Sequence, residues 1–312
     1  MGRKLLIAIG NTGLDKITIN YLINLFRGKN DIAFHLFSVV PLSGVTESQQ
    51  LLSDLETVAN SNPAALQKRA KIKTHQQNLI RQLQTAGFND EQISCEVRFS
   101  WGGVSEAIIE QGQAGLYDAV VLGKRDLSML QQMITGSISS ELWTKKHSLA
   151  LWIINGTPAT RNFLVPVDCS QRTVNALDHL GFMLQGDPEV EITLFHSCSL
   201  LADEHITPQE EFKEKWGKEW CDQHLKGDAD GHYHFHAAEL ILKENKIPAA
   251  HIHRENNDSG IEPAQMIVRE VKKHSYSTIV MGHRLAKDKN IFKGVTDRVL
   301  ANVTDVALWV LT

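Results

Sequence analysis

Short strand-like segments recur along the chain, separated by stretches with helical periodicity. In the first half they lie at residues 5–9, 32–40, 93–99, 120–122 and 149–154. Most of them are continuous apolar runs, which are typical of parallel strands covered on both faces. Strands that alternate with helices predict an α/β fold, with a parallel sheet, right-handed crossovers and helices on both faces.

The segments between these strands carry helix signals of different strength. Asp15 is placed to cap a helix that follows the first strand. Residues 46–86 form a long polar helical region that Asn60–Pro63 interrupts, so two helices fit the pattern as well as one. A further helix is expected at residues 104–113, with Leu116 turned toward the core.

The second half of the chain repeats the order of the first. The apolar run 163–167 follows the run 5–9 at an offset of 158 residues (163 − 5). The offset stays between 157 and 159 at three later pairs, which are Gly123 and Gly282, Gly136 and Gly294, and Trp152 and Trp309. A repeat of this length indicates a duplicated domain. The polar turn 155–160 marks the boundary and predicts domains at residues 1–157 and 158–312.

The composition and charge of the chain indicate which class of protein it belongs to. The 312 residues are enough for two hydrophobic cores, and 42% hydrophobic with 22% charged residues is ordinary for a soluble globular protein. A net charge of −4 provides no basic field for nucleic acid or an anionic membrane surface. The four cysteines lie far apart and are expected to be free cytosolic thiols. No apolar run approaches about 18 residues, so we expect a cytoplasmic protein without a membrane span.

Two related stretches hold the candidate chemistry. In the first half, Gly123-Lys124-Arg125-Asp126 follows a strand, and Gly136-Ser137 comes after nine intervening residues. In the second half, Gly282-His283-Arg284-Leu285 follows a strand, and Gly294-Val295-Thr296 comes after eight. Glycines let backbone N–H groups close on an anion, and a hydroxyl residue at a helix start adds a donor. The chain therefore carries two candidate phosphate loops.

This combination resembles the universal stress protein family in its tandem two-domain form, and the resemblance covers nearly the whole chain. It implies an open, flavodoxin-like sheet of five parallel strands in each half. It implies that a nucleotide, where one is bound, lies at the carboxyl ends of the first and fourth strands. It also implies that the halves pair through their fifth strands, at residues 151–154 and 308–311, with a homodimer as a further possibility.

The C-terminal copy is the preferred nucleotide site. It keeps Asp168 and Ser170 at the end of its first strand, although Leu285 and Val295 replace a glycine and a hydroxyl of the family pattern. Basic neighbours compensate for part of this loss as point charges. The expected ligand is ATP or another adenine nucleotide with Mg²⁺, held by Asp168, Ser170, Gly282, Arg284, Gly294, Val295 and Thr296.

The N-terminal copy departs from the family pattern in the opposite way. Gly10 stands where the family has an aspartate, and Asp126 replaces the second glycine of the loop. A solvated carboxylate there repels a triphosphate by about 1 kcal/mol. The loop residues that this copy retains are Gly123, Arg125, Gly136 and Ser137.

A histidine-rich segment in the second half is compatible with a zinc or nickel site. His232, His234 and His236 alternate as strand-like or loop residues would. The spacing matches no standard site, so a solvated histidine-rich segment is favoured over metal binding.

The function that fits these features is a stress-response regulatory or binding protein with adenine-nucleotide binding in at least one copy. A weak ATPase or nucleotide-dependent switch is one alternative, although no placed general base or pair of metal-binding carboxylates supports catalysis. An interaction scaffold that needs no nucleotide is the other. The sequence identifies no protein partner.

Overall fold

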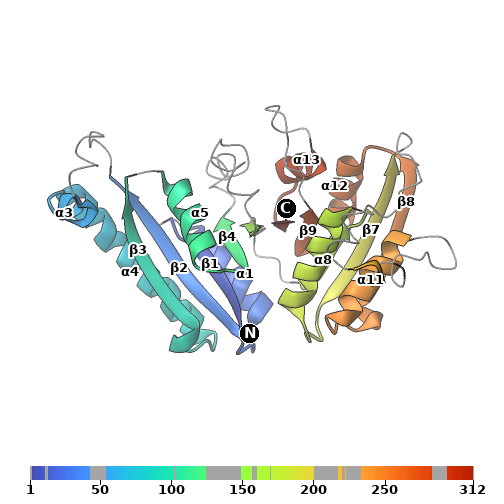
Figure 1. Ribbon diagram of the computed structural model, residues 1–312, viewed down its shortest axis with the longest axis horizontal. Helices are drawn as coiled ribbons and strands as arrows, with labels where there is room; N and C mark the ends of the chain where they lie inside the picture. The colour runs from blue at the N-terminus through green and yellow to red at the C-terminus, as the bar shows by residue number, and fades with distance from the viewer. Residues whose placement is uncertain are drawn as a thin grey trace. The chain divides into compact units, whose positions relative to one another are not determined.

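The computed structural model describes residues 2–10, 13–42, 54–101, 103–123, 149–156, 160–168, 170–199, 217–219, 222, 233–282 and 294–311. By its contacts the chain divides into two compact units, residues 1–157 and 158–312. Each unit contains five parallel strands with helices packed against them (Figure 1). The predicted α/β fold with two tandem parallel sheets is confirmed. The expected pairing of residues 151–154 with 308–311 stays a prediction.

The sheet of the first unit has the strand order β3-β2-β1-β4-β5, and every neighbouring pair is parallel. The order reverses between β1 and β4, and such a reversal is where open parallel sheets place their ligands. The strands are β1 (Arg3–Ala8), β2 (Ile32–Pro41), β3 (Ile93–Ser100), β4 (Ala119–Gly123) and β5 (Ala150–Ile154).

Helices cover both faces of this sheet. Gln76 of α4 reaches one face, where it donates to the carbonyl of Leu36 and to Ser38 Oγ. Gln111 of α5 reaches the other face, on the side of Arg98. The helical elements are α1 (Asp15–Phe26), α3 (Leu55–Asn60), α4 (Pro63–Thr85), the 3₁₀ turn η1 (Asp90–Gln92) and α5 (Val104–Ala114).

The expected break in the polar helical region is confirmed. Asn62 caps α4, because its side-chain oxygen accepts from the Ala65 N–H, and Pro63 occupies the first helical position. The prediction that Leu116 turns inward is wrong. Its φ of 50° reverses the chain after α5, and 78% of the residue is exposed.

The second unit repeats this order with β8-β7-β6-β9-β10, again all parallel. In Figure 1, α8 and α11 lie in front of its sheet and α12 and α13 behind it. The strands are β6 (Asn162–Pro166), β7 (Glu191–Ser199), β8 (Ile252–Gly260), β9 (Thr278–Gly282) and β10 (Ala307–Leu311). The helical elements are α8 (Gln171–Leu184), α11 (Tyr233–Glu244), the 3₁₀ turn η3 (Ala249–His251), α12 (Pro263–Lys273) and α13 (Val295–Asn302).

The repeated tryptophan lies in the core of each unit. Trp152 on β5 is fully buried and stacks on Phe26 of α1, with ring centroids 6.2 Å apart. Trp309 on β10 is fully buried beside Phe163 and His179, the latter on α8. Burying a ring of this size contributes several times more than a methyl group, so the matching residues stabilise equivalent cores.

Candidate functional site

The candidate site of the second unit lies at the carboxyl ends of β6 and β9. These strands are neighbours in the sheet, with Leu164 opposite Ile279. They end at Pro166 and Gly282, next to the first turns of α8 and α13. Helix N-termini present backbone N–H groups and a positive dipole end, so this edge is suited to an anion.

Asp168 lies just beyond β6 with its carboxylate oriented by two hydrogen bonds. Its Oδ1 accepts from the Ser170 N–H at 3.0 Å and from Thr173 Oγ1 at 2.5 Å. Oδ2 has no hydrogen bond within the described part of the chain, and Asp168 is exposed. Ser170 caps α8, because its Oγ accepts from the Thr173 N–H at 3.3 Å. The turn therefore presents one fixed carboxylate oxygen to solvent.

At Gly282 the backbone of β9 lies very close to the first turn of α8. A Cβ at this position would lie 2.8 Å from the carbonyl carbon of Arg172 and 2.9 Å from its oxygen, and backbone atoms cannot move aside cheaply. The Gly282 carbonyl also accepts from Thr296 Oγ1 on α13 at 3.0 Å. The glycine and the threonine thus join β9, α8 and α13 whether or not a ligand is present.

The start of α13 is fixed by its own side chains. Gly294 is the N-cap residue, and its N–H donates to Asp297 Oδ2 at 3.3 Å. Val295 is the first residue of the helix. Arg298 in the next turn pairs with Glu262, the residue that caps α12, at 3.0 Å. The structure therefore brings Asp168, Ser170, Gly282 and Thr296 to one edge of the sheet, while Arg284 lies outside the described residues.

In the first unit, fewer of the residues predicted to form a phosphate loop lie in the described part of the chain. Gly123 ends β4 next to Ile154 of β5, as the sequence indicates. Arg125, Gly136 and Ser137 lie outside the described residues, so their part in a phosphate loop stays a prediction.

In this unit the carboxylate of Asp15, which the sequence analysis assigned to a helix cap, lies beside Gly10. Asp15 does not cap α1; Leu14 is the N-cap residue and provides no side-chain hydrogen bond. The Asp15 side chain points back to the strand end, where Oδ1 accepts from the Gly10 N–H at 3.3 Å. Its Oδ2 lies 2.8 Å from Nε2 of His75 on α4. The repeat offset of 158 pairs Asp15 with Thr173, and that alignment is the signal that would have identified it.

The histidine-rich segment is helical where the structure describes it, since residues 233–244 form α11, so the strand-like alternation is wrong for this part. His232 lies outside the described residues. In the described ranges no group of three potential metal ligands is present. None of the helices in these ranges is long and apolar enough to cross a membrane.

Comparison with known proteins decides the family. The family model described as "Universal stress protein family" matches this chain twice, at residues 1–145 and 159–308. The chain belongs to the universal stress protein family. The two matches show that it is a tandem member, as the resemblance predicted.

One solved structure agrees with this chain at the level of the fold. A universal stress protein from Archaeoglobus fulgidus DSM 4304 is 16% identical, with a TM-score of 0.62, and the match covers 98% of this chain and 95% of that one. A putative universal stress protein from Pseudomonas aeruginosa UCBPP-PA14 is 15% identical, with a TM-score of 0.49 and coverage of 99% and 92%. No curated protein matches the sequence.

Proposed function

We propose that this universal stress protein is a cytoplasmic regulatory protein whose second unit binds an adenine nucleotide at the carboxyl ends of β6 and β9. The main observation in support of the proposal is the orientation of the Asp168 carboxylate. The carboxylate is exposed, and its orientation is fixed through Oδ1 by the Ser170 N–H and Thr173 Oγ1. An oriented carboxylate oxygen accepts hydrogen bonds from an amino group or a ribose hydroxyl at little entropic cost.

The proposed phosphate position is the start of α13, next to Gly282. Backbone N–H groups in the first helical turn have no partner within the helix, which makes such a terminus a place for a phosphate. Thr296 already donates to the Gly282 carbonyl, so it connects α13 to β9 and does not itself donate to phosphate. With Mg²⁺, the nucleotide would span from Asp168 to this terminus.

A second candidate, an interaction scaffold that binds no nucleotide, is favoured by a specific observation. The packing of Gly282 against Arg172 and the Thr296–Gly282 hydrogen bond explain both residues without a ligand. On this account the glycine motif is retained because the fold needs it.

A thermal-shift titration separates these candidates. Ligand at 100 times its dissociation constant stabilises a protein by about 2.7 kcal/mol, which is several degrees in melting temperature. We expect millimolar ATP or ADP with Mg²⁺ to raise the melting temperature of the full chain, and Asp168→Ala to abolish most of the rise. Asp178→Ala, on α8 of the same unit, is the control and should keep the rise. No shift in the unmodified protein would favour the scaffold.

A further inference from the structure

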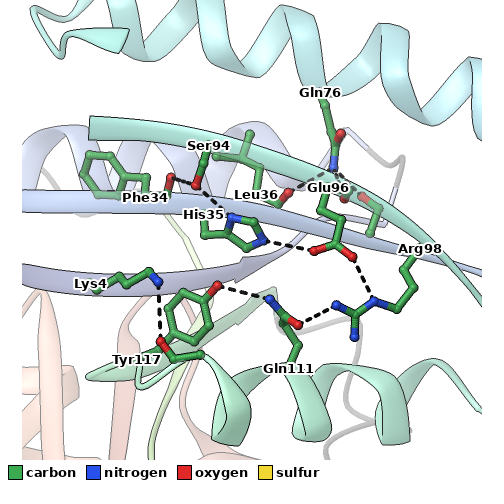
Figure 2. A network of polar contacts seen from close by, with 12 residues as sticks. Lys4, Phe34, His35, Leu36, Gln76, Ser94, Glu96, Arg98, Gln111 and Tyr117 are labelled. Carbon is green, nitrogen blue, oxygen red and sulfur yellow. Dashed lines mark hydrogen bonds and ion pairs between the residues drawn. The ribbon is translucent and has the colours of Figure 1, made fainter. Parts of the chain in front are cut away.

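A polar network crosses one face of the sheet in the first unit (Figure 2). It spans β1, β2 and the outer strand β3 and ends on α5 and the residues that lead into β4. Its side chains come from five parts of the unit and are Lys4 (β1), His35 (β2), Ser94, Glu96 and Arg98 (β3), Gln111 (α5) and Tyr117.

His35 is a largely enclosed titratable group of this network, and its two ring nitrogens have different surroundings. Nδ1 lies 2.7 Å from Ser94 Oγ, and that hydroxyl donates to the Phe34 carbonyl at 3.5 Å. The 2.7 Å contact is much the shorter of the two, and either His35 Nδ1 or the Ser94 hydroxyl can supply its proton.

The other ring nitrogen, Nε2, faces a carboxylate. Nε2 of His35 is buried and has no hydrogen-bond partner among the described residues, while Glu96 Oε2 lies 3.7 Å away. This distance is too long for a hydrogen bond. An unsatisfied buried polar atom is costly and rare in folded proteins. In the protonated ring both nitrogens carry a proton and the ring is cationic, so protonation of His35 would turn this poor contact into an ion pair.

Glu96 is held on its other side by a chain of contacts that reaches α5. Its Oε1 accepts from Arg98 Nε at 2.8 Å. Arg98 Nη2 donates to Gln111 Oε1 at 2.6 Å, and Gln111 Nε2 donates to the Tyr117 hydroxyl at 3.2 Å. A movement of the Glu96 carboxylate therefore changes the contacts that hold Gln111 and Tyr117.

The charged groups around His35 set the pH range in which it can take up a proton. Burial lowers the pKa of His35 below its ordinary 6.5 and is the largest effect, Glu96 opposes it, and the Lys4 and Arg98 cations lower the pKa further. The Tyr117 ring lies beside the imidazole, with centroids 5.8 Å apart, and Lys4 Nζ lies 4.4 Å from the centre of the Tyr117 ring. The neutral form is therefore the resting form near neutral pH.

We propose that His35 and Glu96 form a pH-dependent switch, called the latch below. The protonation state of His35 controls how firmly Arg98 holds α5 through Gln111. In the neutral state Glu96 is bonded to Arg98 and the chain to Tyr117 is complete. When the imidazole is protonated, Nε2 donates to Glu96 Oε2, and the gap of 3.7 Å closes toward the roughly 2.8 Å of a charge-assisted hydrogen bond.

The closing of this gap moves the carboxylate toward β2 and away from Arg98. The guanidinium, which also lies over the Phe37 ring at 4.9 Å, then loses its best acceptor and its fixed position. Gln111 is released with it. Because α5 leads through Tyr117 into β4, acidification is transmitted to the strand that ends at Gly123.

A pH titration of the full chain by NMR tests the latch. Between pH 8 and pH 4.5 we expect His35 to titrate with a midpoint below 6.5. The Gln111 side-chain amide should shift with that same midpoint, and the hydrogen-exchange protection factors of the α5 amides, corrected for the intrinsic pH dependence of exchange, should fall below it. Glu96→Gln removes the moving carboxylate, so His35 should titrate at a still lower pH and the Gln111 shift should disappear. His35→Gln should abolish both transitions.

His253→Gln is the matched control, because His253 also pairs with a glutamate, Glu191, at 2.7 Å but lies in the second unit. It should leave the Gln111 transition unchanged. A His35 midpoint at or above 6.5 overturns the proposal. The proposal is also overturned if the Gln111 amide signal does not shift at the pH midpoint of His35, or if it still shifts at that midpoint in Glu96→Gln. The Glu96→Gln result decides the question even if His35→Gln fails to fold.

Discussion

Nε2 of His75 lies 2.8 Å from Oδ2 of Asp15, and the pair connects α4 to the start of α1 across 60 residues of sequence. The side chains are only 16% and 7% exposed. Through the Asp15 contact with the Gly10 N–H, the pair is also connected to the end of the first strand. The first unit thus has a carboxylate beside the end of its first strand, but a partner within the unit already occupies it.

Loss of His75 should destabilise the first unit substantially. His75→Ala removes a hydrogen bond of 2.8 Å to the buried Asp15 carboxylate, and the loss of a hydrogen bond to a charged group costs about 1.5–3 kcal/mol. Hydrogen exchange of the slowest amides in β1 and β4 measures the change. Glu56→Ala is the control, because Glu56 pairs with Arg69 at the surface and should cost less than about 1 kcal/mol. Equal effects of the two substitutions would contradict this account of the pair.

The second unit should lose stability as the pH falls, because of His179. Burial lowers the pKa of His179 from 6.5 to about 3. The folded state therefore binds fewer protons than the unfolded state between these values, and the stability present above pH 6.5 is lost as the pH falls toward 3. The loss between pH 8 and pH 5 should be about 2 kcal/mol. Urea unfolding monitored by amides of β6 and β9 measures it. A His179→Gln variant with the same pH slope would contradict the assignment.

A methyl group at position 282 should disturb the contact between β9 and α8. Gly282→Ala places a Cβ against the Arg172 backbone, and overpacking of this kind costs about 1–3 kcal/mol. The melting temperature of the full chain measures the loss. Gly13→Ala is the control, since no atom lies within 4 Å of a Cβ there. If Gly282→Ala were neutral for stability and lowered only nucleotide affinity, the glycine would serve the ligand and not the fold.

The fold was predictable from sequence because its strands are short apolar runs. Leu5 to Ile9 and Phe163 to Val167 lie at equivalent places in two sheets of the same order, and almost all their residues are buried. The constant offset between halves carried the same information. Leu116 was predicted wrongly because the helix ends at Gly115, its C-cap residue, and Leu116 then takes a left-handed φ that no residue pattern indicates.

The polar contacts were less predictable because their partners are distant in sequence. Asp15 looks like a helix cap until His75 is placed beside it by the packing of α4 on α1. His35 meets Ser94 only through the parallel register of β2 and β3. The site residues of the second unit were easier, since Asp168 and Gly282 end neighbouring strands and any parallel sheet brings such ends together.

Isothermal titration calorimetry with ATP and Mg²⁺ tests the central claim most directly. The account predicts one nucleotide bound per chain, with affinity reduced at least about tenfold by Asp168→Ala, a loss of roughly 1.4 kcal/mol. Affinity should be unchanged by Asp178→Ala. Absence of measurable binding at millimolar ATP, or binding that Asp168→Ala leaves intact, would contradict it.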